Sequence, residues 1–206
     1  MRNRILKVAA SCCVLALSTA VSPAAAANLL SNGDFETGAL SPWAGVGGLA
    51  FNATIVVQSP DNGPSAPGTH SAFLDNRAEA NGLTMAQTTA NGTATPGVVF
   101  YSFDLKLGTA VNGGVFFVEI FAQNAGGGVI GGPGLLGNYT PANWTTFSGS
   151  FVAPAGTDHL TIQFEAPTGA VHGSISSMAV DNVDLHQALH TPVRESSWSR
   201  LKGVYR

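Results

Sequence analysis

The stretch VVFYSFDLKL, from Val98 to Leu107, is the clearest indication of the fold class of this chain. Its odd-numbered positions, beginning with Val99, are all apolar, and the even-numbered positions after Phe100 are polar or charged. Alternation with a period of two is typical of a β-strand that is buried on one side. We therefore predict a strand here, with the odd-numbered side chains in a core and Phe100 on the opposite face.

Short apolar runs of the same kind flank this stretch and are separated by clusters of Gly, Pro, Asn and Asp. Leu160–Phe164 alternates in the same way, and Phe147–Phe151 does so more weakly. The other candidate strands are Phe51–Val57, Ser71–Leu74, Leu83–Thr88, Val115–Phe121 and Ile175–Leu185. Eight or nine short strands without long helical periodicity predict an all-β fold, a jelly-roll β-sandwich of two antiparallel sheets.

Two segments depart from simple alternation. Val115–Phe121 is apolar on both faces, so we expect one face to join the core and the other to form a covered surface or a ligand groove. Asn124–Gly137 is the most Gly-rich segment, and it lacks the Gly-Lys-Ser/Thr ending of a phosphate loop. We predict a flexible loop between strands, which could border a binding cleft because glycine permits close approach of a ligand.

The N-terminus has the order of a secretory signal peptide. Three basic residues, Arg2, Arg4 and Lys7, precede an apolar stretch from Val8 to Val21, and residues 24–27 are all alanine. We predict a signal peptide over residues 1–27 and a secreted or cell-surface protein, bacterial because the signal is short and its cleavage region is rich in alanine. The apolar stretch is shorter than the roughly 20 residues of a membrane-spanning helix.

Both cysteines, Cys12 and Cys13, lie inside this segment, so the domain that follows contains no disulfide. In an alternative interpretation Cys12 is the lipidated residue of a lipoprotein. Two observations disfavour it: Ala9 stands where a larger aliphatic residue is usual, and the apolar stretch continues beyond the cysteines.

Residues 28–187 have the length of one domain, and their charge is strongly negative. Between Asn28 and His190 the basic residues are Arg77 and Lys106, against 11 of the chain's 12 acidic residues. A nucleic-acid-binding protein neutralises phosphates with lysine and arginine, so we exclude nucleic acid as a partner. A negative field suits a cation, or a neutral ligand such as a sugar.

Residues 188–206 differ from the domain before them. After Pro192, the apolar residues Trp198 and Leu201 recur at helical spacing among basic side chains, so the segment reads as a basic amphipathic tail. Two interpretations remain open: a disordered tail, or a docking or sorting signal with a cell-surface partner, since an exposed tryptophan favours a partner.

The two ends of the domain carry a resemblance to a known family. NLLSNGDFETGALSPW (28–43) and ISSMAVDNVDLHQ (175–187) resemble the ends of carbohydrate-binding modules of the galactose-binding-like jelly-roll superfamily, in particular the cellulose- or xylan-binding CenC-type modules. The resemblance covers most of residues 28–187. It implies a secreted, non-catalytic module that recognises a neutral glycan or polysaccharide.

The same resemblance implies a structural calcium ion that links the first and last strands. Glu36 and Asp181 are the acids of the two end motifs, and Asp34 and Asn32 could add oxygen atoms. Calcium takes several oxygen ligands, both carboxylates and backbone carbonyls. The alternative is that Asp34 caps a turn and Asp181 accepts hydrogen bonds from nearby backbone amides.

A sugar site needs flat apolar rings together with polar side chains for the hydroxyl groups. We expect Trp43 and Trp144 to pack in or beside the core, since those positions do so in related modules. The better candidates for ligand contact are rings expected to be exposed and polar residues near the Gly-rich segment: Phe100, Phe116, Tyr139, Gln123 and Asn138.

Catalytic patterns are weak in this sequence. Glu119 and Glu165 lie on predicted strands and could face each other, but we interpret each as an exposed edge charge. The sequence has no Gly-x-Ser-x-Gly elbow and no His-Glu-x-x-His helix. We predict that the protein is not an enzyme. An extracellular structural or adhesion protein with the same fold, attached through its tail, is the alternative function, and a small glycan-acting enzyme is the third.

Overall fold

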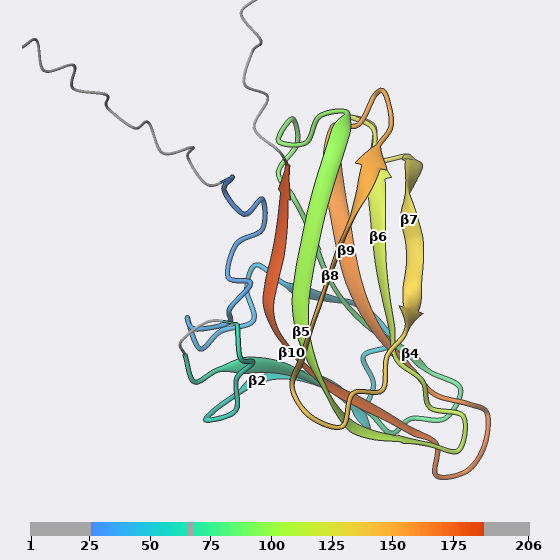
Figure 1. The fold of residues 1–206 in the computed structure, drawn as a ribbon. Helices are drawn as coiled ribbons and strands as arrows, with labels where there is room; N and C mark the ends of the chain where they lie inside the picture. The colour runs from blue at the N-terminus through green and yellow to red at the C-terminus, as the bar shows by residue number, and fades with distance from the viewer. Residues whose placement is uncertain (1–25, 66–67, 188–206) are drawn as a thin grey trace, which may run out of the picture.

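The computed structural model describes residues 26–65 and 68–187, which form two five-stranded antiparallel sheets packed face to face (Figure 1). The first sheet has the strand order β1 (Ala44–Gly47), β4 (Gly82–Thr88), β9 (His159–Pro167), β6 (Phe117–Gln123) and β7 (Val129–Asn138). The second sheet has the order β2 (Ala53–Gln58), β3 (Ser71–Asn76), β10 (Ile175–Gln187), β5 (Gly97–Val111) and β8 (Thr145–Ala153). The predicted all-β sandwich is confirmed.

Some predictions concern residues outside the described part of the chain. The first 25 residues of the predicted signal peptide, with Cys12, belong to this group, and so does the predicted tail over residues 188–206. Within the described residues, no helix is long and apolar enough to span a membrane.

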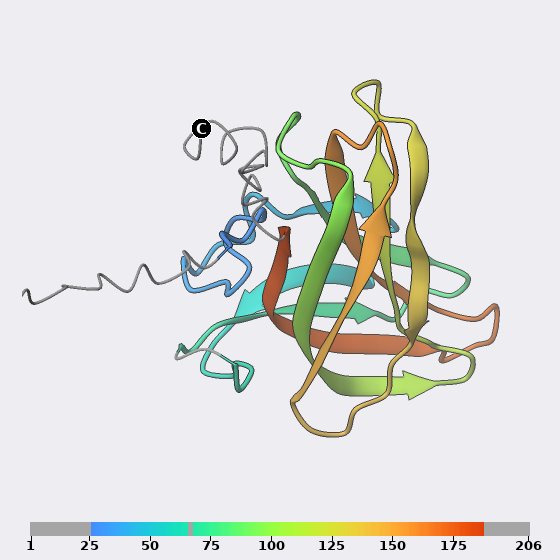
Figure 2. The ribbon, with the colours of Figure 1, turned by 45° about the horizontal axis from the view of Figure 1, so that its top comes forward.

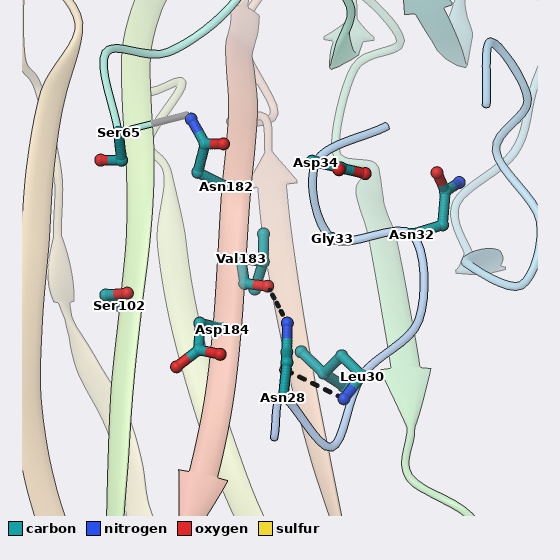
Figure 3. A pocket seen from close by; sticks show the side chains of 10 residues that line it. All are labelled: Asn28, Leu30, Asn32, Gly33, Asp34, Ser65, Ser102, Asn182, Val183 and Asp184. Atoms are coloured by element: carbon teal, nitrogen blue, oxygen red, sulfur yellow. Dashed lines mark hydrogen bonds between the residues drawn. The ribbon is translucent and has the colours of Figure 1, made fainter. Parts of the chain in front are cut away.

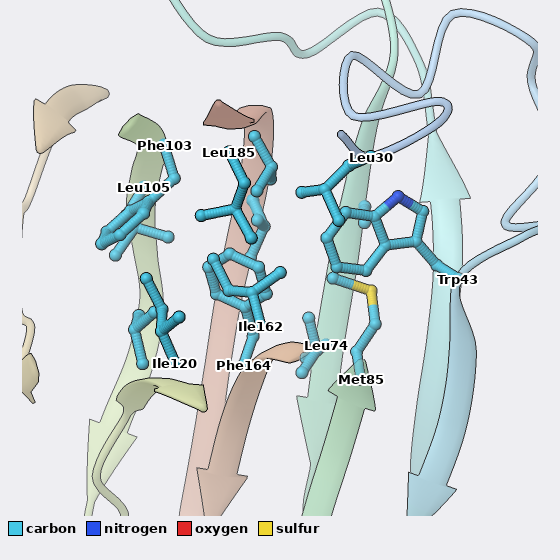
Figure 4. Packing of buried hydrophobic residues seen from close by; sticks show 14 of the residues in the cluster. Leu30, Trp43, Leu74, Met85, Phe103, Leu105, Ile120, Ile162, Phe164 and Leu185 are labelled. Carbon is cyan, nitrogen blue, oxygen red and sulfur yellow. The ribbon is translucent and has the colours of Figure 1, made fainter. Parts of the chain in front are cut away.

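The core lies between the two sheets and is built from alternate side chains of their strands (Figure 4). On β5, Val99, Phe103 and Leu105 are fully buried, so the inward orientation predicted from the alternation is confirmed. The Phe103 ring meets the Phe164 ring of β9 edge-on, with 5.7 Å between their centroids. Such contacts join strands that are distant in sequence into one apolar layer.

The two ends of the domain meet along β10, as the end motifs predicted. The Leu29 amide donates to the Leu185 carbonyl at 2.7 Å, and the Val183 amide donates to the Gly33 carbonyl at 2.9 Å. Gly33 is required at this crossing, because a Cβ atom there would lie 2.1 Å from the Val183 oxygen. Residues 28–43 are irregular rather than a strand, but Figures 1 and 2 both show them beside β10.

The prediction of a flexible loop over Asn124–Gly137 is wrong for most of that segment. A turn that ends at Gly128 is followed by β7, the edge strand of the first sheet, which pairs with β6. An edge position tolerates Pro133 because only one side of the strand needs backbone donors. Gly132 and Gly134, with φ of 107° and 60°, accommodate irregular register between β6 and β7. The short strand β1 was also not predicted.

Candidate functional site

The two acids of the end motifs lie near each other beside the loop that precedes β3. Asp181 on β10 is 2% exposed and accepts hydrogen bonds from the Gly63 amide (2.6 Å) and the Asn182 amide (2.7 Å). Burial raises the pKa of Asp181 to about 7, and the charges of Asp104 and Glu36 act in the same direction. A carboxylate that is costly to ionise therefore stands within electrostatic reach of two others.

Glu36 is held by the backbone across from it. Its Oε1 accepts hydrogen bonds from the amides of Thr69 (2.7 Å) and His70 (2.8 Å). The hydrogen bond from the His70 amide is the main reason that the pKa of Glu36 is lowered. Glu36 thus fastens the chain just before β3 to the N-terminal segment.

The other two predicted metal ligands do not join this pair through their side chains. Asn32 donates from Nδ2 to the carbonyls of Ala39 (2.8 Å) and Ser41 (3.0 Å), so its amide organises a local turn. Asp34 is exposed, and its Oδ1 accepts a 3.4 Å contact from the Glu36 amide. Within residues 26–65 and 68–187, no three His, Cys, Asp or Glu side chains form a group that could hold a metal ion.

A buried acid that was not expected lies next to this region. Asp104 occupies an even position of β5, where the alternation predicted exposure, yet it is fully buried. Its carboxylate accepts hydrogen bonds from the Ser65 amide (3.1 Å), the Thr146 hydroxyl (2.5 Å) and Asn182 Nδ2 (2.7 Å). Sequence alternation cannot reveal this burial, because the donors that make it possible come from three distant segments.

A cavity of about 390 Å³ opens between the N-terminal segment and the outer face of the second sheet (Figure 3). Its lining is mostly polar and comes from the N-terminal segment, the loop that contains Ser65, and strands β5 and β10. The lining residues are Asn28, Leu30, Asn32, Gly33, Asp34, Ser65, Ser102, Asn182, Val183 and Asp184.

The aromatic residues predicted to contact a ligand are not brought together. Phe100 is 38% exposed on the outer face of the second sheet and stacks on His186, with 5.3 Å between ring centroids. The prediction that Phe116 is exposed is wrong: Phe116 precedes β6, and its fully buried ring contacts Phe164. Tyr139 is half-buried and packs edge-on against Phe147 at 4.6 Å, so its ring contributes to the core.

The two polar candidates differ in position. Asn138 is exposed at the end of β7, where its Oδ1 accepts a hydrogen bond from the Phe116 amide (3.3 Å) and caps the start of β6. Gln123 ends β6, and its Oε1 accepts a hydrogen bond from the Thr161 hydroxyl at 2.6 Å. Of the five candidates, Gln123 is therefore on the outer face of the first sheet, whereas Phe100 is on that of the second.

The two tryptophans of the domain also differ. Trp43 is 3% exposed in the core, as expected, and donates from Nε1 to the Asn32 carbonyl at 3.0 Å. Trp144 is half-buried and does not belong to the core cluster, so the core expectation is wrong for it. Its Nε1 donates to Asp61 at 2.8 Å, and the Lys106 ammonium lies 5.6 Å from the ring centroid.

The outer face of the first sheet carries a row of polar groups that we call the β6–β9 face. Because Val118, Ile120 and Ala122 point into the core, the alternate residues of β6 point outward. Two of these are half-buried phenylalanines that are not among the residues packed on the core. The face comprises Phe117, Glu119, Phe121 and Gln123 of β6 and Thr161, Gln163 and Glu165 of β9.

Gln163 links the two glutamates of this face. Its Nε2 donates to Glu119 Oε2 at 2.5 Å and to Glu165 Oε1 at 2.7 Å, so both amide hydrogens are used. Burial raises the pKa of Glu165, and the charge of Glu119 adds to that effect. The interpretation of these glutamates as exposed edge charges is wrong, because β6 and β9 are inner strands of the sheet. The order of the strands in the sheet, which the sequence does not show, decides whether these glutamates lie at an edge.

Comparison with known proteins gives similarity of structure only. No protein-family model matches the chain, and no curated protein matches it. Among solved structures, the enzymatically active domain of tailspike protein 4 of bacteriophage CBA120 is 17% identical, with a TM-score of 0.61 over 77% of this chain and 21% of that one. This chain thus corresponds to about a fifth of the tailspike chain.

Two further solved structures match over nearly their whole length. The first family-22 xylan-binding domain of Xyn10C from Paenibacillus barcinonensis is 16% identical, with a TM-score of 0.53 over 80% of this chain and 97% of that one. The family-61 module TmCBM61, solved with β-1,4-galactotriose, is 16% identical, with a TM-score of 0.51 over 79% and 99%. The fold is shared with carbohydrate-binding modules. At these identities the similarity establishes the architecture and not the ligand.

Proposed function

We propose that the protein is a secreted, non-catalytic carbohydrate-binding module that binds a neutral glycan across the β6–β9 face. One observation carries the proposal. Two half-buried phenylalanine rings of β6, Phe117 and Phe121, share a face with the hydrogen-bonding residue Gln163 of the neighbouring strand β9. Aromatic rings cover the C–H surface of a sugar ring, and the polar row receives its hydroxyl groups. The signal-peptide pattern of residues 1–27 supports secretion.

The hydrogen-bonding groups of the face favour a neutral ligand. Gln163 uses both amide hydrogens on Glu119 and Glu165, so its remaining polar atom, Oε1, is an acceptor, and ionised carboxylates accept as well. The two Lys and Arg residues of the described chain are engaged elsewhere, Arg77 with Asp75 and Lys106 with Asp61. Sugar hydroxyls can donate to such a face, whereas carboxylated or sulfated glycans would be repelled.

A binding role fits the two glutamates better than catalysis does. Both carboxylates accept from the same nitrogen, at 2.5 and 2.7 Å, so the bonded oxygens are no more than about 5 Å apart. Retaining glycosidases use a similar separation, so the surroundings of the pair, rather than its spacing, favour binding. The two glutamates lie on an open strand face, and the cavity lined by Ser102 and Asp184 is on the other sheet. Glycosidases enclose their carboxylate pair in a site that excludes water and orients the scissile bond.

We also propose a structural calcium ion between Glu36 and Asp181. Support comes from the raised pKa of Asp181, since a nearby divalent cation would stabilise the ionised form that burial and two neighbouring acids disfavour. Because Asn32 is bonded within a turn and the Asp34 side chain does not join this pair, backbone carbonyls and water would have to complete the shell of six to eight oxygens. The ion would supply no chemistry beyond fastening the N-terminal segment to β10.

The glycan proposal is tested by affinity electrophoresis of the full chain in gels that contain xylan, cellulose derivatives or galactan, with polygalacturonate as the anionic comparison. We expect retardation by at least one neutral polysaccharide and none by polygalacturonate. Phe121→Ala and Gln163→Ala should each weaken binding by about tenfold. Phe100→Ala makes the same change on the other sheet and should leave binding unchanged. If no neutral polysaccharide retards the chain, the proposal fails.

Calcium is tested separately, by the melting temperature of the full chain with calcium and with chelator. An ion bound only by the native state raises stability by mass action, so calcium should increase the melting temperature by several degrees, roughly the effect of about 2 kcal/mol. Asp181→Asn should abolish the increase. Equal melting temperatures of the unsubstituted chain under the two conditions would remove calcium and leave the glycan proposal standing.

An adhesion role is the second candidate, and exposed apolar side chains around the turn between β1 and β2 favour it. Phe51 is 99% exposed, and Val46 and Leu49 are 61% and 62% exposed. Adjacent exposed apolar groups favour contact with another macromolecule. If this role is correct, Phe51→Ser should reduce attachment of the protein to cells that lack the polysaccharide, and a normal level of attachment would exclude it.

A further inference from the structure

The cavity of Figure 3 contains polar groups whose hydrogen-bonding capacity is not used within the described part of the chain. The Ser102 hydroxyl makes no hydrogen bond to any described residue. Asn182 donates from Nδ2 to Asp104 at 2.7 Å, and its Oδ1 accepts no hydrogen bond from a described residue. Asp184 accepts from His186 with one oxygen, and no described residue donates to the other. Asp34 receives only the 3.4 Å contact already described.

These unused groups are mostly acceptors, and two of them carry negative charge. Among the residues that the structure describes, no Lys or Arg lines the cavity, and Asp184 pairs with His186. Carboxylate and amide oxygens can only accept, so a ligand must bring several donors. An ammonium group brings three hydrogens together with the opposite charge, which makes it the best match.

The volume of the cavity and the apolar part of its lining further define the ligand. A volume of about 390 Å³ is at the lower end of the range for small-molecule sites, so it suits a single ring rather than a chain. Leu30, which is 6% exposed, is the apolar side chain beside the acceptors. A single sugar ring with a C–H face, hydroxyl groups and an ammonium group matches the volume, the apolar lining and the acceptors of the cavity.

We propose that this cavity is a second binding site, independent of the β6–β9 face, for one amino-sugar unit with a free ammonium group. The carboxylate of Asp184 receives the ammonium group, and the negative charge of Asp34 in the same cavity attracts it. Ser102 and Asn182 bind ring hydroxyls, and Leu30 contacts the C–H face of the ring.

The test is a titration of the isotope-labelled full chain, followed by nuclear magnetic resonance in chelator at about pH 7. Three matched ligands are used: glucosamine, glucose and glucuronate. We expect glucosamine to shift the amide signals of Gly33, Val183 and Asp184 saturably, glucose to bind about tenfold more weakly, and glucuronate to give no shift.

Two variants and one control assign the effect to the cavity. Asp184→Asn should weaken glucosamine about tenfold and remove its advantage over glucose. Asp34→Asn, at an exposed position that leaves folding intact, should act in the same direction. Glu79→Gln removes an exposed carboxylate outside the cavity and should change nothing.

Four outcomes overturn the proposal. The first is equal binding of glucose and glucosamine, and the second is an absence of shifts with glucosamine. The third is displacement of glucosamine by calcium in a sample without chelator, with shifts of the same amides, which would make the cavity a metal site. The fourth is binding that emerges only after Arg194, Arg200, Lys202 and Arg206 are changed to glutamine, which would make the chain's own basic tail the occupant.

Discussion

The raised pKa of Asp181 leads to a quantitative prediction for the dependence of stability on pH. The folded chain holds the proton of this carboxyl more tightly than the unfolded chain does, because the carboxyl is 2% exposed and lies near Asp104 and Glu36. Its stabilising effect is therefore fully present below about pH 4 and is lost as the pH rises to about 7. Above that range the carboxyl is ionised in both states, and its contribution becomes constant.

The magnitude follows from the two pKa values. One unit of pKa corresponds to about 1.4 kcal/mol, and the pKa rises from 3.8 in the unfolded chain to about 7 in the folded one. In the absence of calcium, the free energy of unfolding should therefore decrease by up to about 4 kcal/mol across this range. Saturating calcium should oppose the decrease, since the metal binds the carboxylate form.

The assay is urea unfolding in chelator at pH values from about 4.5 to 8, on the unsubstituted chain and on Asp181→Asn. Comparison of the two isolates Asp181, because burial also raises the pKa of Glu165 and both proteins contain Glu165. Glu36, Asp61 and Asp158 have lowered pKa values, so their contributions change only at lower pH. If the two free energies run parallel from pH 4.5 to 8, the reasoning about Asp181 is refuted.

Three further predictions concern the fold and use urea unfolding at constant pH. Phe103→Ala should destabilise the domain by about 3–5 kcal/mol, because it empties a fully buried position among four other rings; a loss below 1 kcal/mol would contradict the described core. Gly33→Ala should cost several kcal/mol because its Cβ would lie 2.1 Å from a backbone oxygen of β10, whereas Gly82→Ala, with open space around it, should be nearly neutral. Trp144→Phe should cost about 1 kcal/mol through loss of the hydrogen bond to Asp61, and an unchanged midpoint would show that this bond adds no stability.

Strands with an apolar face and a polar face were predictable from sequence, and strands without that alternation were not. β5 and β9 alternate clearly, and both were predicted within a few residues of their observed bounds. β7 contains VIGGPGLLGN, whose glycines and proline are typical of a loop. It is a strand because its backbone pairs with that of β6. This pairing is a tertiary effect, which the local propensity of the sequence does not show.

The candidate site was predictable only in part, because side chains meet through strand order and register. Asp181 and Glu36 could be paired from the end motifs, and the structure brings them together. The contact of Glu119 and Glu165 through Gln163 depends on β6 lying next to β9, about 40 residues away in the chain. Phe116 was misplaced because Val115–Phe121 is apolar on both faces, so its sequence does not show that Phe116 shares the inward face of Val118 and Ile120.

The hydrogen bonds between the N-terminal segment and β10 have a consequence for biosynthesis. Asn28 donates to the Val183 carbonyl and accepts from the Leu185 amide, across separations of 155 and 157 residues. The sandwich therefore cannot close until nearly the whole domain has left the ribosome, and contacts of such long range form slowly. A chain that stays open until its last strand arrives can still pass through a translocation channel, so this order of contacts suits the proposed secretion.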